Sequence, residues 1–292
     1  YSYTDALFNH KDIPHFNHLH PNLAYGYGNE GLYYGDVASF IRYFKFLGIS
    51  FPILTLMKEE GKDGVLEMFS FFCFSFLKYN TEKKLAKNKC ESKITYYIGA
   101  RNKFLLALLT PFFKKMFTKS FNDYKNDDRP FLVRRGLLRD KNFLFERDTV
   151  KFKFDSTLNI IKQRCFFLTH KKSTKSLSID FNKIAEGQIS RFGEIGILGF
   201  QIYKNKNIIK IYPRVCPHEG GDLDVNNEVG VKYTLDNFLK NKCRVRCNVH
   251  NRMFKPILSI NLDEKQKTYK SECYLFNVIE NSLEISLLEK KQ

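Results

Sequence analysis

Hydrophobic and polar positions divide the chain into a first half with long apolar runs and a second half with short alternating ones. In the first half, residues 40–51 and 64–77 are Phe-rich segments of helical length, which predict buried or pocket-lining helices. Residues 79–91 are charged and rich in lysine, and they predict a solvated loop. Residues 93–100 alternate weakly, as a strand does. We therefore expect the first half to be α+β and mostly helical.

The apolar stretch that follows residue 103 predicts a long amphipathic helix over 104–140. We expect an interruption at Pro111, because proline lacks the backbone N–H that a helix interior needs. The next residues mix polar turns with short apolar pieces, as a linker does. These patterns predict a first domain over 1–145, a linker over 146–176 and a second domain over 177–292.

The second domain shows the period of two that is typical of half-buried strands. Apolar and polar residues alternate in five segments separated by turn residues: 176–181, 195–203, 208–215, 254–262 and 274–288. Within the last of these, residues 280–282 suit a hairpin turn. We expect an all-β second domain.

The net charge of +17 narrows the choice of partners. Lysine outnumbers arginine, and no basic run matches a nucleic-acid-binding motif, so we expect no nucleic acid partner. An acidic redox protein, such as a ferredoxin, suits a basic chain better. An anionic membrane surface is the alternative partner.

Three uncharged apolar runs, 46–57, 68–77 and 104–113, are shorter than the ~18 residues that a membrane span needs. No span is predicted, although their aromatic content leaves peripheral membrane contact open. The start of the chain shows no signal-peptide pattern, and the cysteines outside the motifs below show no paired spacing. These features predict a reducing, cytoplasmic location. Because the first residue is Tyr1, truncation of the first domain at its N-terminus is also left open.

Two motifs in the second domain carry metal-ligand residues at matched spacing. They are Cys216-x-His218 and Cys247-x-x-His250, so each supplies one thiolate and one imidazole. Two of each is the ligand set of a Rieske [2Fe–2S] cluster, whose thiolates hold one iron and whose imidazoles hold the other. The Gly-Gly pair after His218 frees backbone N–H groups for the sulfurs.

A structural zinc site is the alternative, because zinc takes the same four residue types. The Cys-x-His spacing is tighter than in most zinc knuckles, which favours the cluster. The 28 residues between the motifs, 219–246, are more than the ferredoxin type would need, and residues 225–241 among them predict an inserted excursion. The nearby Cys243 has no histidine at matching spacing and is expected to be a bystander.

The start of the first domain carries a second candidate metal motif, Asn9-x-x-Asp12-x-x-His15-x-x-x-x-His20. Asp12 and His15 are three residues apart and would share one helix face. His15 and His20 are about 140° apart around an ideal helix, so both reach one metal only where the helix ends or kinks. Pro21 disfavours helix at His20. An incidental cluster of histidines is the alternative.

Together these motifs resemble the Rieske non-heme iron oxygenases, the oxygenase and ferredoxin type rather than the quinol-oxidising Rieske proteins. The helix predicted over 104–140 resembles the last helix of that family's catalytic domain, where an acidic pair supplies the third iron ligand. On that match Asp128 is the ligand, with His15 and His20, and Asp127 is the second choice. The alternative is an ordinary acidic turn paired with neighbouring basic residues.

The resemblance implies a partial START-like helix-grip fold for the first domain, and it implies a [2Fe–2S] cluster and a mononuclear Fe(II) as cofactors. It implies a Rieske-type oxidoreductase, a monooxygenase or dioxygenase. A ferredoxin or flavin reductase would reduce the cluster through His218 or His250, and the mononuclear iron would activate O2 on an apolar small-molecule substrate. Asp12 would bridge a cluster histidine and an iron histidine, often between subunits of a ring, so a homo-oligomer is expected.

Two features depart from that family. The iron motif precedes the cluster domain here, and residues 23–92 show few predicted strands. An electron carrier is therefore kept as the alternative function: a Rieske ferredoxin-like module fused to a helical lipid- or partner-binding domain, without catalysis. A zinc-stabilised binding protein is a third.

Overall fold

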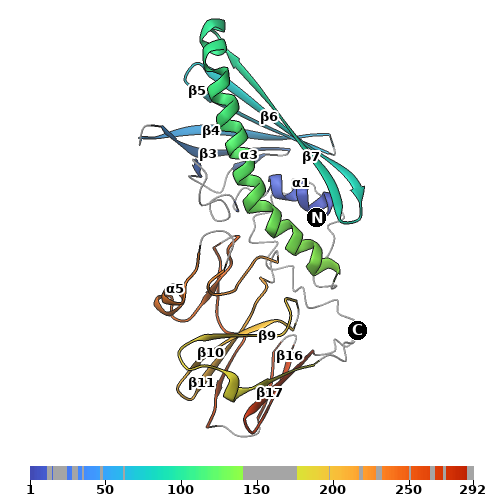
Figure 1. Cartoon of the computed structure of the whole chain (residues 1–292), viewed down its shortest axis with the longest axis vertical. Helices are drawn as coiled ribbons and strands as arrows, with labels where there is room; N and C mark the ends of the chain where they lie inside the picture. Colours follow the sequence, from blue (N-terminus) through green and yellow to red (C-terminus); the bar gives the residue numbers. More distant parts are fainter. Residues whose placement is uncertain are drawn as a thin grey trace. The chain divides into compact units, whose positions relative to one another are not determined.

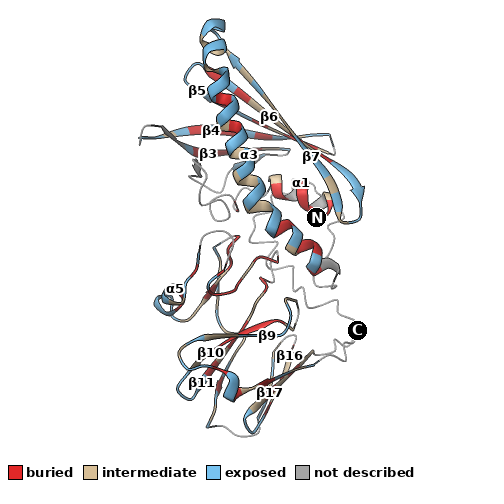
Figure 2. Cartoon of the chain, viewed as in Figure 1, coloured by how far each residue is buried: buried red, intermediate tan, exposed pale blue. Residues whose placement is uncertain are grey.

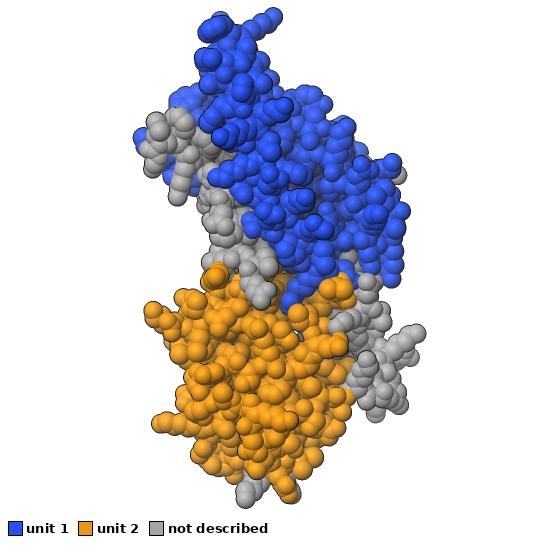
Figure 3. All heavy atoms as spheres, in the orientation of Figure 1, with its two compact units in different colours: residues 1–136, 146–157, 229–231 blue, residues 137–145, 158–228, 232–292 orange. Residues whose placement is uncertain are grey.

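The computed structural model describes residues 1–11, 15, 25–27, 32–34, 36–46, 49–61, 63–140, 176–196, 198–216, 220–227, 232–249, 251–263, 267–271 and 274–287. The chain divides into two compact units (Figure 3). Unit 1 holds residues 1–136, 146–157 and 229–231, and unit 2 holds 137–145, 158–228 and 232–292. Most of the expected linker lies outside the described residues, so its boundaries stay a prediction.

Unit 1 is built on a seven-stranded antiparallel sheet with the strand order β1-β3-β4-β5-β6-β7, in which β2 also pairs with β3 (Figure 1). The strands are β1 Tyr25–Tyr27, β2 Leu32–Tyr34, β3 Val37–Phe46, β4 Ile49–Glu60, β5 Gly64–Phe71, β6 Phe74–Ala86 and β7 Lys89–Ala100. From β3 to β7 each strand pairs with the next one in the chain, so the sheet is a meander of hairpins.

The prediction of a mostly helical first half is wrong, although its α+β class is correct. The segments 40–51 and 64–77 form the β3–β4 and β5–β6 hairpins instead of helices. Residues 79–91, expected to be a solvated loop, belong largely to β6 and β7. Residues 23–92 therefore contain the strands that the sequence pattern did not predict.

The long helix α3, Lys103–Asp140, confirms the helix predicted over 104–140. The expected interruption is not found, because the helix continues through Pro111 and Pro130. It begins after Asn102, whose side-chain Oδ1 accepts a hydrogen bond from the backbone N–H of Leu105 (3.0 Å). Among the helices that the structure describes, none combines the length and the apolar composition of a membrane span.

Helix α3 crosses one face of the unit 1 sheet (Figure 1). Its buried Phe113 and Phe117 pack on a cluster of sheet side chains, Ile53, Phe69, Phe74 and Phe76. The rings meet edge to face, for example Phe74 on Phe113 with centroids 4.9 Å apart. Figure 2 shows that the buried positions of α3 follow one side of the helix. Removing these apolar surfaces from water is the main force that holds helix to sheet.

The short helix α1, Tyr3–Lys11, lies on the same face of the sheet, against β5, β6 and β7. A buried ion pair joins it to α3: Arg135 Nε lies 3.0 Å from Asp5 Oδ1, and both side chains are 3% exposed. This ion pair therefore joins the N-terminal helix of unit 1 to the C-terminal part of α3.

The described strands of unit 2 form three antiparallel sheets, with strand orders β14-β11-β10-β9, β12-β13 and β15-β16-β17-β8. The strands are β8 Ser176–Asp180, β9 Ile189–Phe192, β10 Phe200–Asn205, β11 Ile208–Pro213, β12 Val245–Arg246, β13 Met253–Phe254, β14 Leu258–Asn261, β15 Lys267–Lys270, β16 Tyr274–Ile279 and β17 Ser282–Leu287. Each segment predicted from the alternation contains strand, although β10 begins only at Phe200 and β14 only at Leu258. The hairpin turn at 280–282 is confirmed.

The core of unit 2 lies between its two four-stranded sheets. Ile202 and Ile211 from one sheet and Phe276 and Ile285 from the other belong to one buried cluster. In the described part of the segment between the two Cys/His motifs lies the helix α5, Leu235–Lys240, which begins with a capping box formed by Thr234 and Asn237.

Candidate functional site

Unit 1 brings together two of the predicted iron ligands. Nε2 of His15 lies 3.7 Å from Oδ1 of Asp128, with the imidazole fully buried and the carboxylate largely so. Two ligand atoms about 2.1 Å from one metal lie roughly 3 to 3.6 Å apart, depending on the angle between the bonds. The donor atoms are those of a pair of iron ligands, and their separation of 3.7 Å lies just above this range.

Asp128 faces inward because of its place on α3. It follows Tyr124 by four residues and precedes the buried Leu132 by four, so the three share one side of the helix. Seven residues further along the same side, Arg135 makes the ion pair with Asp5 of α1. This pair fixes the rotation of α3 against the segment that leads to His15.

A cavity of about 380 Å³ opens beside Asp128, between α1, the sheet and α3. Asp128 lines it, and so do Asn9 and His10 of α1. The volume falls within the range of about 300–1,000 Å³ that is usual for small-molecule sites.

The sheet contributes buried charged residues to this cavity. Glu67 forms ion pairs with Arg42 and with Lys78, whose Nζ lies 3.4 Å from Oε2 of Glu67. Arg42 also lies over the ring of Phe69, 4.9 Å from its centroid. A paired network of this kind keeps the cost of burying charges tolerable.

A second buried carboxylate, Glu82, is also paired. Its oxygens contact His10 Nε2 at 2.7 Å and the hydroxyl of Ser92 at 2.5 Å. Burial raises the pKa of the nearby Cys90 thiol to about 12, and Glu82 acts in the same direction. Because the thiolate is the metal-binding form of cysteine, Cys90 is a poor ligand candidate at neutral pH.

In unit 2, Cys216 and Cys247 lie on two loops with the same backbone hydrogen bonds. The N–H of Gly220 donates to Cys216 O, and the N–H of Cys216 donates to Gly221 O (both 2.9 Å). In the second loop the N–H of Asn251 donates to Cys247 O (3.0 Å), and the N–H of Cys247 donates to the carbonyl five residues on (2.8 Å). Gly220 and Asn251, at equivalent positions, both have positive φ.

The two loops also contact each other. A Cβ on Gly221 would lie 2.7 Å from Cys247 Sγ and 2.8 Å from Val249 Cγ2, so only glycine allows this approach. Asp222 N donates to Asn248 Oδ1 (2.8 Å), and Asn248 N donates to Asp222 O (3.1 Å). Both cysteines are fully buried and neither forms a disulfide. Two buried cysteines on adjoining equivalent loops fit the thiolate half of a [2Fe–2S] site.

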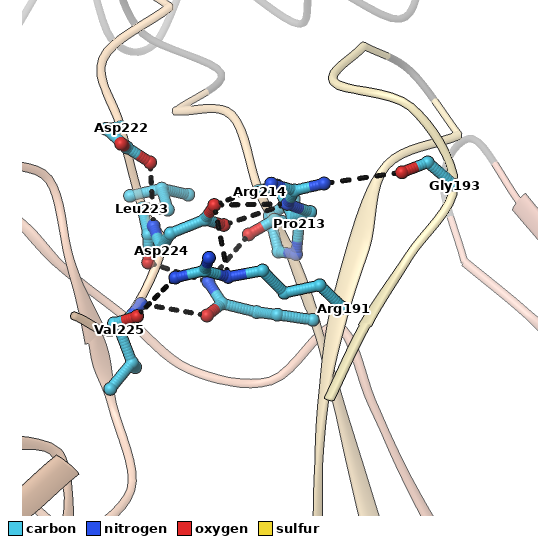
Figure 4. Close-up of polar contacts among 9 residues, drawn as sticks. Arg191, Gly193, Pro213, Arg214, Asp222, Leu223, Asp224 and Val225 are labelled. Carbon is cyan, nitrogen blue, oxygen red and sulfur yellow. Dashed lines mark hydrogen bonds and ion pairs between the residues drawn. The ribbon is translucent and has the colours of Figure 1, made fainter. Parts of the chain in front are cut away.

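An ion pair braces the chain just after the first loop (Figure 4). Asp224 accepts from Nε of Arg214 at 3.0 and 3.1 Å and from Nη2 at 2.8 Å. Gln201 of β10 donates to Leu223 O (2.7 Å) and accepts from Val225 N (3.0 Å). A bidentate guanidinium–carboxylate pair is rigid, so the loop that carries Cys216 is held from both sides.

The excursion between the motifs is packed against the sheet. Phe238 of α5 is fully buried and meets the rings of Tyr203 and Tyr212 edge to face, at 5.2 and 5.6 Å. The hydroxyl of Tyr212 donates to Cys243 O (2.6 Å), and that of Tyr233 donates to Arg244 O (2.7 Å). These hydrogen bonds hold the backbone of residues 243 and 244, which leads to Cys247.

The remaining predicted ligands, His20, His218 and His250, and the predicted bridge Asp12 lie outside the described residues. Asp127, the second choice on α3, is partly exposed next to Asp128. Among the described positions alone, no group of three or more His, Cys, Asp or Glu side chains could hold a metal ion. The described part of the chain thus contains two ligands of each expected centre.

The sequence did not point to the polar residues that the sheet directs into the cavity, Glu67, Lys78, Asn80 and Glu82. They lie in segments predicted to be helix or loop, so their shared face was hidden. The signal that could have found them is the period of two in Lys78, Asn80 and Glu82.

The chain was compared with protein-family models, with curated proteins and with solved structures, and nothing among them matches it.

Proposed function

We propose that this chain is a Rieske-type oxygenase, with a [2Fe–2S] cluster held by Cys216, His218, Cys247 and His250. A mononuclear Fe(II) would be held by His15, His20 and Asp128. The observation that carries this proposal is the 3.7 Å approach of His15 to Asp128, because the two residues come from separate motifs at opposite ends of unit 1. An incidental histidine cluster or a solvated acidic turn gives no reason for that approach.

The architecture supports the same proposal. A meander sheet crossed by one long helix is compatible with the helix-grip fold that the resemblance implies for the first domain. Two packed antiparallel sheets that carry two matched cysteine loops are compatible with a Rieske domain. The sequence pattern predicted few strands in residues 23–92, which was one departure from the family. The structure has strands there, so this departure no longer applies.

When bound, the cluster supplies one-electron transfer, and the mononuclear iron supplies activation of O2 toward an organic substrate. The residues of the chain have separate tasks. Cys216 and Cys247 present thiolates from a dry interior, and His15 and Asp128 present an imidazole nitrogen and a carboxylate oxygen to one point. The Asp5–Arg135 ion pair holds α1 and α3 together and so helps to keep His15 close to Asp128.

The partners follow from charge and from the open cavity. The net charge of +17 favours an acidic ferredoxin or flavin reductase as electron donor. The substrate would enter the cavity of about 380 Å³ that Asp128 lines.

The metal content of the full-length protein tests the proposal. Protein reconstituted under anaerobic conditions should hold about three irons per chain, two of them in the cluster. The His15→Ala variant should lose one iron and keep the Rieske optical and EPR spectra. About two irons in both proteins would support the electron carrier instead, and a colourless protein that contains only zinc would support the zinc-binding alternative.

A further inference from the structure

Asn80 occupies an unusual position in the middle of the polar half of β6. It is 1% exposed and lies on the inward face of the strand. Its cross-strand neighbours are Val65 on β5 and Ile94 on β7, and neither has a polar side chain. Directly opposite residues on antiparallel strands share a face. The two residues directly opposite Asn80 therefore offer its amide no hydrogen-bond partner.

The inward residues on either side of Asn80 differ from it in this respect. Lys78 lies opposite Glu67 and pairs with it, and Glu82 lies opposite Ser92 and accepts its hydroxyl. Both amide atoms of Asn80, Oδ1 and Nδ2, have no hydrogen-bond partner within the described part of the chain. A buried amide left in that state costs stability, so its presence needs a reason.

Asn80, Lys78 and Glu82 all line the cavity that Asp128 also lines. A ligand that enters this cavity would therefore lie next to the Asn80 amide. We propose that this cavity binds a neutral ligand that carries an N–H donor next to a carbonyl acceptor, as in a lactam or a cis amide. The Asn80 amide would pair with both groups at once.

The charges of the cavity favour a neutral ligand over an ion. Glu67 is paired with Arg42 and Lys78, and Glu82 is hydrogen-bonded to His10 and Ser92, so neither carboxylate needs a cation from the ligand. Among the described side chains, the two buried cations of the sheet, Arg42 and Lys78, balance the two buried carboxylates, Glu67 and Glu82, so the sheet has no excess buried cation for a carboxylate ligand. A neutral polar group avoids the desolvation cost that an unmatched buried ion would bring.

Apolar residues complete the lining, among them Met57, Ile94, Phe121 and Leu132. They suit a hydrocarbon body, so the ligand class is an apolar molecule with one amide or lactam group. The assignment of this ligand as the substrate rests on the proposed function. The binding of the ligand through Asn80 is independent of that function.

Isothermal titration of the full-length protein with two matched probes tests the inference. Isoindolin-1-one is a neutral lactam, and N-methylisoindolin-1-one lacks its N–H donor. The wild type should bind the lactam about ten-fold more tightly, as expected for one well-made buried hydrogen bond. The Asn80→Leu variant, of similar volume, should bind the two compounds equally.

The control is Thr81→Val, a polar-to-apolar change on the opposite face of the same strand, which should keep the wild-type preference. Asn80→Ala provides a second variant if Asn80→Leu does not fold, and it should also lose the preference. Equal binding of both compounds by the wild type, no measurable binding of either, or an unchanged preference in both Asn80 variants would overturn the inference. The iron content of the same preparations reports on the proposed function separately.

Discussion

His15 Nε2 lies 3.7 Å from Asp128 Oδ1, although 113 positions separate the two residues in the chain. The approach depends on α1 and α3, which lie on the same face of one sheet and are joined by a buried ion pair, Asp5–Arg135. The packing that builds unit 1 therefore also builds the candidate iron site.

We predict that Arg135→Met lowers the free energy of unfolding by about 3 kcal/mol, because it leaves the buried Asp5 carboxylate without its cation. Urea unfolding followed by circular dichroism measures this change. Iron bound per chain should fall as well, since the pair holds α3 against the segment that leads to His15.

The double variant Asp5→Leu/Arg135→Met should recover most of the lost stability, because it removes the carboxylate together with its partner. Equal destabilisation in the single and the double variant would show that the buried charge is not the cause.

Stability should also fall in the alkaline range because of Tyr96. Its ring stacks on Phe117, with centroids 4.4 Å apart. Burial raises the pKa of Tyr96 to about 12, although nearby Arg42 acts in the opposite direction. The unfolded chain, with a tyrosine pKa of about 10, loses this proton first. The free energy of unfolding should therefore drop as the pH rises from about 10 to 12, on the order of 2 kcal/mol from this residue.

The measurement compares wild type with Tyr96→Phe, which removes the ionisable hydroxyl and keeps the stacked ring. Urea unfolding at a series of alkaline pH values should give a shallower decline for the variant. Parallel profiles would mean that Tyr96 contributes nothing to the alkaline loss.

Gly221→Ala should reduce the amount of [2Fe–2S] cluster per chain to less than half. The added Cβ would lie 2.7 Å from Cys247 Sγ, so one of the two loops must move. Visible absorbance per chain measures the cluster. Gly187→Ala is a suitable control in the same unit, because its Cβ would meet nothing within 4 Å and only backbone strain is added. Similar cluster content in both variants would argue against the contact of the loops.

The strands of unit 2 were predictable because apolar residues there alternate with polar ones. In β10 and β11, inward residues such as Ile202 and Ile211 are fully buried, and polar residues stand between them. The period of two is then visible in the sequence itself.

Unit 1 hides the same period. The outward face of its sheet carries large apolar residues, including Leu54, Met68 and Tyr97, all well exposed. The inward face carries Glu67 and Lys78 among its phenylalanines. With apolar groups on both faces, a strand looks like a helix of the same composition, and only pairing with its neighbours reveals it.

The candidate site was predictable only where it follows a spacing rule. His15, Cys216 and Cys247 stand in short motifs, and Asp128 stands on a helix with a clear apolar face. Asn80 belongs to no motif. Its position between Val65 and Ile94 depends on the register of three strands, which no local pattern contains.

The most direct test of the iron site compares two neighbouring carboxylates on α3. Asp128→Ala should lower the iron content from about three to about two per chain, the two that remain being those of the cluster. Asp127→Ala should keep all of the iron, since Asp127 is displaced by about 100° around the helix. The Rieske EPR signal should be the same in both variants. Full iron content in Asp128→Ala, or loss of one iron in Asp127→Ala, would contradict the assignment of His15 and Asp128 as ligands of one iron.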